Sequence, residues 1–305
     1  MKFLQISKRV TLFLLVNFLV LTTLTLILKL FGLERFFRPG QYETLAVFCL
    51  AWGMAGALIS LAISRWVAKW AMGVQVIDVN TDDPVEREVL TMVHALAQRA
   101  QLPKMPQVGI YASEEVNAFA TGPSKSRSLV AVSSGLLHNM ERPEVQGVLA
   151  HEVSHIANGD MVTMTLIQGV VNAFAMFLAR ILAFVVSQAM RSRDDDSRGG
   201  GYFVNYLLVM VFEWVFLLLG SLVTAWFSRQ REFRADAGGR ILAGKEQMIG
   251  ALRALQRIHE APHVEEARGA SLQMLKISGK QGGLLALFAS HPPLEVRIAA
   301  LEKLP

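Results

Sequence analysis

The chain has very little cysteine and little charge. Cys49 is its single cysteine, so no disulfide can form within the chain and no redox role is indicated. Charged residues make up 18% of the 305 positions, whereas hydrophobic residues make up 52% and the mean hydropathy is +0.38. This composition is too apolar for an ordinary soluble domain.

A long basic run and an internal repeat are also missing. The formal net charge is +5 and the pI is about 9.5, but the lysines and arginines flank apolar segments instead of gathering in one stretch. The pattern therefore does not indicate a nucleic-acid partner, and it fits a protein that lies against anionic lipid. Without an inverted repeat, a transporter is disfavoured.

The first two apolar runs are Val10–Leu28 and Thr44–Ile63. Each is long enough to cross a hydrocarbon core of about 30 Å as a helix. The first could instead be a signal peptide, but no small-residue cleavage pattern follows it. We therefore expect two uncleaved spans at the amino terminus.

Two further apolar runs cover residues 161–186 and 203–227, and both contain polar residues. Arg180 and Glu213 are the charged ones, and a charge inside a span is costly unless it is paired or faces protein. We expect a second membrane hairpin in which these two side chains pair. The alternative is a hairpin that lies partly in the enzyme body or at the interface.

The most informative motif is His151-Glu152-Val153-Ser154-His155, which follows a helical pattern over residues 143–150. Positions i and i+4 share a helix face, so both imidazoles can bind one metal ion, and neutral imidazole suits Zn²⁺. Glu152 is placed to take a proton from a water molecule at the metal. This pattern indicates a metal-dependent peptide hydrolase, although the bare motif is weakly specific.

A third ligand is expected from residues 228–236. Glu232 and Asp236 are again four residues apart, so Glu232 can bind the metal while Asp236 fixes the tautomer of a ligating histidine. The alternative is a charged helix end, with Arg229, Arg231 and Arg234 as membrane-flanking anchors.

The His-Glu-x-x-His pattern occurs a second time, at His259-Glu260-Ala261-Pro262-His263. Pro262 removes a helical N–H and clashes with the preceding turn, so the two histidines should not share a helix face. We interpret this copy as a helix end followed by a loop-rich segment, residues 261–283.

The rest of the polar sequence predicts a small α+β body. A helix is expected over residues 84–100 and another over 242–256, with a short strand at 108–111. Asn117–Gly122 and Ser128–Val132 should form two strands across a turn that contains Gly122 and Pro123. The first could hold an extended substrate by main-chain hydrogen bonds, or could belong to an ordinary hairpin. Pro292 can open a last helix, which would leave His291 just ahead of it.

The topology follows from parity. Both histidines and Glu232 must lie in one compartment, so the segment between them crosses the membrane an even number of times. Its connector, residues 191–201, is charged and glycine-rich, and should be a solvated loop. Lysines and arginines near the first two spans favour a cytoplasmic amino terminus and catalytic body. Five lie on that side and three lie in the intervening loop: Lys2, Lys8, Arg9, Arg65 and Lys69 against Lys29, Arg35 and Arg38.

Taken together, these motifs resemble the membrane-bound zinc metallopeptidases of the M48 family. The resemblance runs over essentially the whole chain, through Asn117–Gly122, His151–Asp160, Ser228–Ala237 and Ser290–Glu295. It implies one zinc ion per chain, held by three protein ligands beside a general base. The family's roles transfer to the following positions: His151, His155 and Glu232 as ligands, Glu152 as base, Asp236 behind a ligand, and His291, Arg297 and Asn117 near the transition state or substrate.

The resemblance also implies a fold and a location. The fold would be a mainly α membrane protein with a zincin-like α+β domain, a small sheet and transmembrane helices. Its parts would be an amino-terminal hairpin (1–66), two pieces of the protease domain (67–160 and 228–305) and a second hairpin (161–227) between them. The protease would lie in the bacterial inner membrane with its active site in the cytoplasm, and take part in stress response and quality control.

Protein substrates, above all membrane proteins, and the lipid bilayer are the expected partners, and a homo-oligomer is left open. The competing interpretation is an inactive membrane scaffold or adaptor with a purely structural zinc ion. Structural zinc sites usually have four protein ligands, often cysteines, whereas three ligands and an adjacent base favour a catalytic site.

Overall fold

The computed structural model describes residues 41–190, 200–260 and 289–304. The chain divides into two compact units, which are Met1–Leu58 with Leu166–Val223 (unit 1) and Ile59–Thr165 with Thr224–Pro305 (unit 2). Three predicted features lie outside the described residues: the first apolar span, the charged part of the connector and the loop-rich segment after the second His-Glu-x-x-His pattern.

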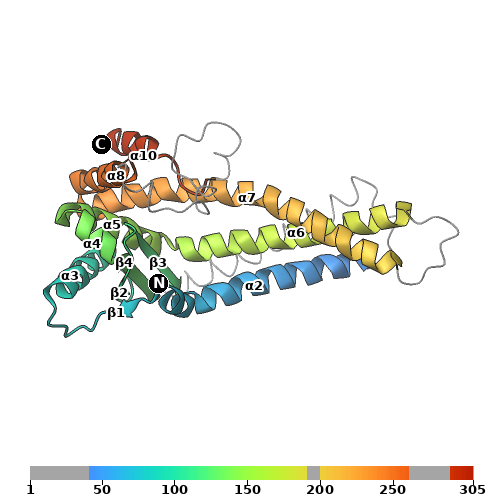
Figure 1. The fold of residues 1–305 in the computed structure, drawn as a ribbon, viewed down its shortest axis with the longest axis horizontal. Helices are drawn as coiled ribbons and strands as arrows, with labels where there is room; N and C mark the ends of the chain where they lie inside the picture. The colour runs from blue at the N-terminus through green and yellow to red at the C-terminus, as the bar shows by residue number, and fades with distance from the viewer. Residues whose placement is uncertain (1–40, 191–199, 261–288, 305) are drawn as a thin grey trace. The chain divides into compact units, whose positions relative to one another are not determined.

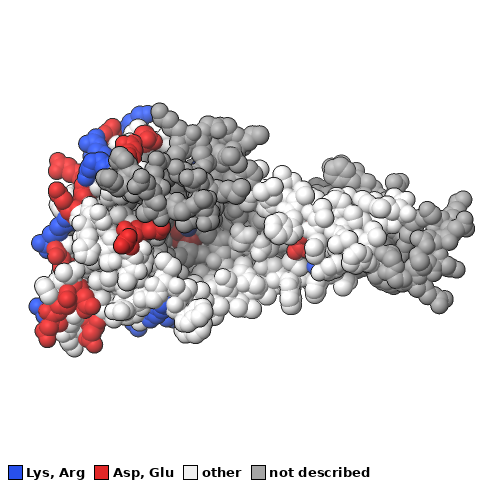
Figure 2. Space-filling model, viewed as in Figure 1, with Lys and Arg blue, Asp and Glu red and all other residues white. Residues whose placement is uncertain are grey.

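Three long helices contain the other predicted spans. They are α2 (Gln41–Met72), α6 (Asp160–Met190) and α7 (Gly200–Ala243). All three are long and apolar enough to cross a membrane. On the face shown in Figure 2, charged side chains gather on unit 2, whereas the visible surface of these helices in unit 1 is almost entirely uncharged.

In unit 1, α2 and α6 bury a shared apolar core. Its fully buried members come from both helices: Ala46, Cys49, Leu50 and Met54 on α2, with Ala173, Met176, Phe177 and Ile181 on α6. The predicted pairing of Arg180 with Glu213 is confirmed, because Arg180 Nη1 lies 3.5 Å from Glu213 Oε2.

Unit 2 contains a four-stranded mixed sheet in the order β1-β2-β4-β3. Strands β2 and β4 are parallel, and the two outer pairs are antiparallel. The strands are β1 (Gln75–Val76), β2 (Gln107–Tyr111), β3 (Ala118–Ser124) and β4 (Arg127–Ser133). Strand β3 therefore lies at one edge of the sheet.

The hairpin between β3 and β4 differs from the prediction. The turn is at Lys125-Ser126, and Gly122-Pro123 lies inside β3 at a register irregularity between Thr121 and Ser124. Gly122 has φ +143°, and any Cβ there would clash with the carbonyl oxygen of Arg127. Pro123 has no N–H to donate, which suits an irregular position on an edge strand. The two turn-forming residues thus make a bulge instead of the turn.

Helix α5 (Arg142–Asn158) is the centre of unit 2. It begins with a capping box between Glu141 and Glu144, and it ends at Gly159, whose φ of 76° is left-handed. Around it pack β3 and β4 of the sheet, α3 (Pro84–Arg99) and α8 (Lys245–Glu260) (Figure 1). Gly147 allows the approach of α8, because a Cβ there would clash with the carbonyl oxygen of Gln247. Burial on several sides makes α5 a rigid support.

Two helix starts differ from the prediction. Leu242 belongs to the end of α7, and α8 starts at Lys245 because the backbone breaks at Gly244. The last helix, α10 (Leu294–Glu302), starts after Pro293 instead of at Pro292. The fold class itself is confirmed, since the chain is mainly helical with a small mixed sheet and three apolar helices.

Candidate metal centre

His151 and His155 project from the same face of α5, as their spacing predicts. Their Nε2 atoms lie 3.1 Å apart, and both side chains are buried. Helix α7 reaches this face because Gly238 opposes Ser154 of α5, where a Cβ would lie 2.6 Å from Ser154 Oγ. The close contact brings the acidic residues of α7 next to the two imidazoles.

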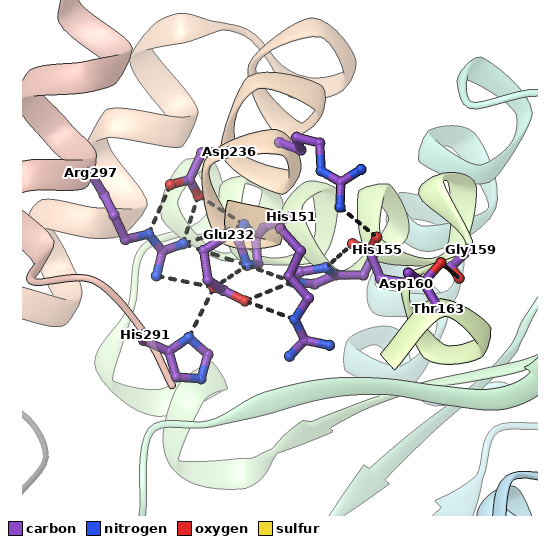
Figure 3. A network of polar contacts seen from close by, with 11 residues as sticks. His151, His155, Gly159, Asp160, Thr163, Glu232, Asp236, His291 and Arg297 are labelled. Carbon is purple, nitrogen blue, oxygen red and sulfur yellow. Dashed lines mark hydrogen bonds and ion pairs between the residues drawn. The ribbon is translucent and has the colours of Figure 1, made fainter. Parts of the chain in front are cut away.

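Glu232 of α7 faces both histidines and is 0% exposed. Its Oε2 lies 3.3 Å from His151 Nε2, and its Oε1 lies 3.4 Å from His155 Nε2 (Figure 3). A tetrahedral metal ion about 2.0–2.1 Å from each ligand requires ligand atoms about 3.3 Å apart. Although fully buried, the Glu232 oxygens have no aligned hydrogen-bond partner among the described residues. The donor set and its spacing therefore fit a metal ion.

Two further carboxylates hold the imidazoles from behind. Asp236 Oδ1 lies 2.9 Å from His151 Nδ1, and Asp160 Oδ2 lies 2.7 Å from His155 Nδ1. In both rings Nδ1 is thus occupied by a carboxylate, and Nε2 is directed at Glu232. This arrangement fixes the tautomer and the orientation of a ligating histidine.

The same contacts change the acidity of the two rings. Burial alone would lower the pKa of His155, but its contacts with the Asp160 and Glu232 carboxylates raise that pKa to about 9. Burial also opposes protonation of His151, and its contacts with the Asp236 and Glu232 carboxylates again raise its pKa. A metal ion that binds here must displace these protons, so metal binding and proton release are coupled.

Arg297 of α10 completes the network around Asp236. Its Nε and Nη2 lie 2.8 and 2.6 Å from the two carboxylate oxygens of Asp236, and its Nη1 lies 3.5 Å from Glu232 Oε2. The guanidinium is buried, and this planar two-point contact orients the Asp236 carboxylate. Arg297 therefore orients the carboxylate that contacts the candidate ligand His151.

His291 is an exposed neighbour of the buried Glu232. Its Nδ1 is 2.9 Å from Glu232 Oε2, and its side chain is 55% exposed (Figure 3). Glu152, the predicted base, follows His151 on α5 and is only partly buried. Asn117 precedes edge strand β3, where its backbone exchanges hydrogen bonds with Ser133. The structure therefore brings His291 to the candidate ligand Glu232, and places Asn117 just before an edge strand that packs beside α5.

Sequence reasoning missed Asp160 and the roles of two arginines. Arg231 Nε lies 3.6 Å from Glu232 Oε1, and Arg234 Nη2 lies 3.9 Å from Asp160 Oδ1, so both contact carboxylates of the centre in addition to flanking an apolar run. The sequence feature that could have indicated Asp160 is its position: its carboxylate directly follows Gly159, which ends the helix that carries both histidines.

Of the second His-Glu-x-x-His pattern the structure describes His259 and Glu260, and neither belongs to the centre. His259 lies near the end of α8, where its Nδ1 contacts the Leu255 carbonyl oxygen at 2.7 Å, and the helix ends at Glu260. Within residues 41–190, 200–260 and 289–304, the group suited to a metal is His151, His155 and Glu232.

Comparisons with known proteins show the family of the chain. The profile of Peptidase family M48 matches residues 84–305. A "Protease HtpX homolog" of Methylacidiphilum infernorum is 50% identical over 303 residues, covering 98% of this chain and 99% of the relative. "Protease HtpX" of Pasteurella multocida is 51% identical over 296 residues, covering 97% of this chain and 98% of the relative. A "Protease HtpX homolog" of Bacillus velezensis is 48% identical over 304 residues, covering 97% of this chain and 99% of the relative.

The fold also resembles a solved structure, "Crystal Structure of S. mikatae Ste24p". The TM-score is 0.55 at 18% identity, and the match covers 98% of this chain and 65% of the Ste24p chain. This likeness concerns the fold alone. The profile match and the full-length relatives show that the chain belongs to peptidase family M48, and with its apolar helices it is a membrane-bound metalloprotease.

Proposed function

We propose that the chain is a zinc-dependent endopeptidase that binds one zinc ion through His151, His155 and Glu232. The observation that carries the proposal is the spacing of 3.1 to 3.4 Å among their ligand atoms around a buried carboxylate without an aligned hydrogen-bond partner. Catalytic zinc sites use three protein ligands of this type and keep the fourth position open.

Each residue around this centre would have a separate role in peptide hydrolysis. Bound zinc would lower the pKa of a water molecule and polarise the scissile carbonyl. Glu152 would accept the proton of the attacking water and pass it to the leaving amine. His291 would donate a hydrogen bond to the carbonyl oxygen as negative charge builds on it, since its exposed ring lies beside the candidate ligand Glu232. Asp236, oriented by Arg297, would keep His151 aligned.

The edge of the sheet offers a place for the substrate. Strand β3 pairs with β4 on one side, and within the described residues no strand pairs with its other side. An extended peptide could add to that side through main-chain hydrogen bonds, next to the helix that carries both histidines. We propose that Asn117, just before β3, contacts this peptide.

The location follows from the spans and their charges. We propose a multi-pass protein of the bacterial inner membrane, with an amino-terminal hairpin over residues 1–66. The protease domain, residues 67–160 and 228–305, would face the cytoplasm and be interrupted by a second hairpin over 161–227. Span parity and the lysine and arginine bias support this orientation. A protease placed there would degrade damaged membrane proteins.

The test is activity of the full-length protein after controlled removal of metal. Protein purified in detergent with a chelator should not cleave casein, and one equivalent of Zn²⁺ should restore cleavage. Metal analysis should give one zinc per chain. Full zinc occupancy without cleavage of any protein substrate would favour the alternative of an inactive scaffold.

A further inference from the structure

Helices α6 and α7 of unit 1 carry polar side chains within their apolar stretches. Arg180 pairs there with Glu213, and just past the end of the α6 stretch Ser187 Oγ lies 3.4 Å from Asn205 Oδ1. Charged and strongly polar side chains inside membrane spans are costly, and they commonly mark binding or transport sites. The family chemistry described above does not use these residues, so they need another explanation.

Helix α7 is packed very differently from its neighbours in unit 1. Helices α2 and α6 share a buried core, whereas no side chain of α7 from Phe203 to Thr224 is buried. Beside Glu213, Trp214 is 78% exposed. Much of the α7 surface in unit 1 is therefore available to lipid or to another helix.

The ion pair is not enclosed either. The side chains of Arg180 and Glu213 are 31% and 30% exposed. Arg180 Nη1 contacts both Glu213 and the Met176 carbonyl oxygen, at 3.5 and 2.9 Å. A guanidinium has five N–H donors, and among the contacts within the described residues only Nη1 is used. A pair that merely joined α6 to α7 would be cheaper if it were sealed from lipid, because burial in protein shields the charges.

We infer that the Arg180–Glu213 pair binds a transmembrane helix of the substrate that carries a polar or charged side chain in its apolar core. An intact membrane protein buries such side chains against its own helices, whereas a damaged one exposes them to lipid without partners. The pair offers a donor and an acceptor together, so it complements acidic, basic and amide side chains. This inference rests on the proposed function and gives it a means of selecting damaged membrane proteins.

The test uses two membrane substrates that share one cleavable soluble segment and differ at one position. One span has a central Asn and the other a Leu. In reconstituted vesicles the wild-type enzyme should show a KM about three- to tenfold lower for the Asn span, the range of a hydrogen bond between membrane helices. The double variant Arg180→Met/Glu213→Gln should lose this preference while casein cleavage stays unchanged.

A matched control removes an ion pair elsewhere. Arg253 and Glu302 form an exposed pair at 3.0 Å in unit 2, so Arg253→Met/Glu302→Gln should keep the preference for the Asn span. Arg180→Lys keeps the positive charge and should retain most of the preference for the Asn span. This variant keeps the test decisive if the double variant fails to fold. Equal KM values for both spans in a wild-type enzyme that cleaves casein would overturn the inference. Loss of casein cleavage in the wild type would instead defeat the proposed function.

Crosslinking reports binding without cleavage. A photoreactive benzoylphenylalanine at Trp214, beside the ion pair, should label the Asn span more than the Leu span. The same group at Trp52, which is 64% exposed on α2, should not distinguish the two spans. Labelling at Trp214 confined to residues 10–28 of the same chain or to a second copy would mean that another helix covers the pair, and would overturn the inference.

Discussion

Asp160 holds His155 through a contact of 2.7 Å between Oδ2 and Nδ1, and this contact is the counterpart of the one between Asp236 and His151. Asp160 is the first residue of α6, directly after the left-handed Gly159 that ends α5. Each candidate histidine ligand is therefore oriented by a carboxylate from a different helix.

Replacing Asp160 should weaken metal binding. We expect Asp160→Ala to raise the zinc Kd about 10- to 100-fold, because the His155 ring loses the partner that fixes its orientation. Asp160→Asn keeps an oxygen acceptor for His155 Nδ1, so its zinc Kd should rise less. Competition with a chromophoric chelator measures both Kd values, and the exposed Asp82→Ala serves as control. An unchanged Kd in Asp160→Ala would remove this residue from the metal centre.

Replacing Glu152 should separate chemistry from metal binding. Glu152→Gln keeps the size of the side chain but cannot accept a proton, so kcat should fall by about 10²- to 10⁴-fold while zinc stays bound. Glu232→Ala should instead lose zinc, as metal analysis of the purified protein would show. Near-native kcat in the Glu152→Gln variant would exclude Glu152 as the base.

His291 touches the candidate ligand Glu232, so its variant distinguishes two roles. If the ring stabilises the developing oxyanion, His291→Ala should lower kcat and kcat/KM together with little change in KM or in zinc Kd. If its main task is to hold the Glu232 carboxylate at 2.9 Å, the zinc Kd should rise instead. Steady-state kinetics combined with chelator competition decides between them.

The contact between α5 and α8 should be sensitive to a single methyl group. In Gly147→Ala the new Cβ would clash with the Gln247 carbonyl oxygen, and we expect the free energy of unfolding to fall by about 1–3 kcal/mol. Gly250 on α8 faces open space, so Gly250→Ala should be neutral or more stable by up to about 1 kcal/mol. Thermal unfolding in detergent compares the two, and equal effects would contradict the packing described for α5.

Membrane topology is tested by labelling single cysteines in a Cys49→Ala background. Reagents that cannot cross the membrane should reach cysteines at Arg38 and Lys245 from opposite sides, since the first lies between two predicted spans and the second lies in the protease domain. A cysteine at Asp195 should be reached from outside if both α6 and α7 cross the bilayer. Labelling of position 195 from the cytoplasm would indicate a re-entrant hairpin.

Much of the site could be predicted because its local parts obey one helical period. His151 and His155 are four residues apart, as are Glu232 and Asp236, so helix geometry alone places each pair on one face. The long apolar runs likewise need only length and composition to predict membrane helices. The pairing of Arg180 with Glu213 follows from the cost of a lone charge in lipid.

Other features depended on contacts between distant segments. The turn-forming Gly122-Pro123 lies within β3, because the register with β4 carries the strand on to Ser124. Helix α7 continues to Ala243 and stops only at Gly244, a boundary that the apolar pattern of residues 242–256 does not reveal.

The sequence by itself determined the kind of chemistry, since a metal-binding pair, a base and a third carboxylate are encoded in short helical spacings. Only the tertiary structure decided how these groups are held. Arg297 reaches Asp236 across 61 positions, and Asp160 reaches His155 across the break at Gly159. Such contacts follow from the packing of α5, α6, α7 and α10, and no local periodicity predicts them because they join separate helices.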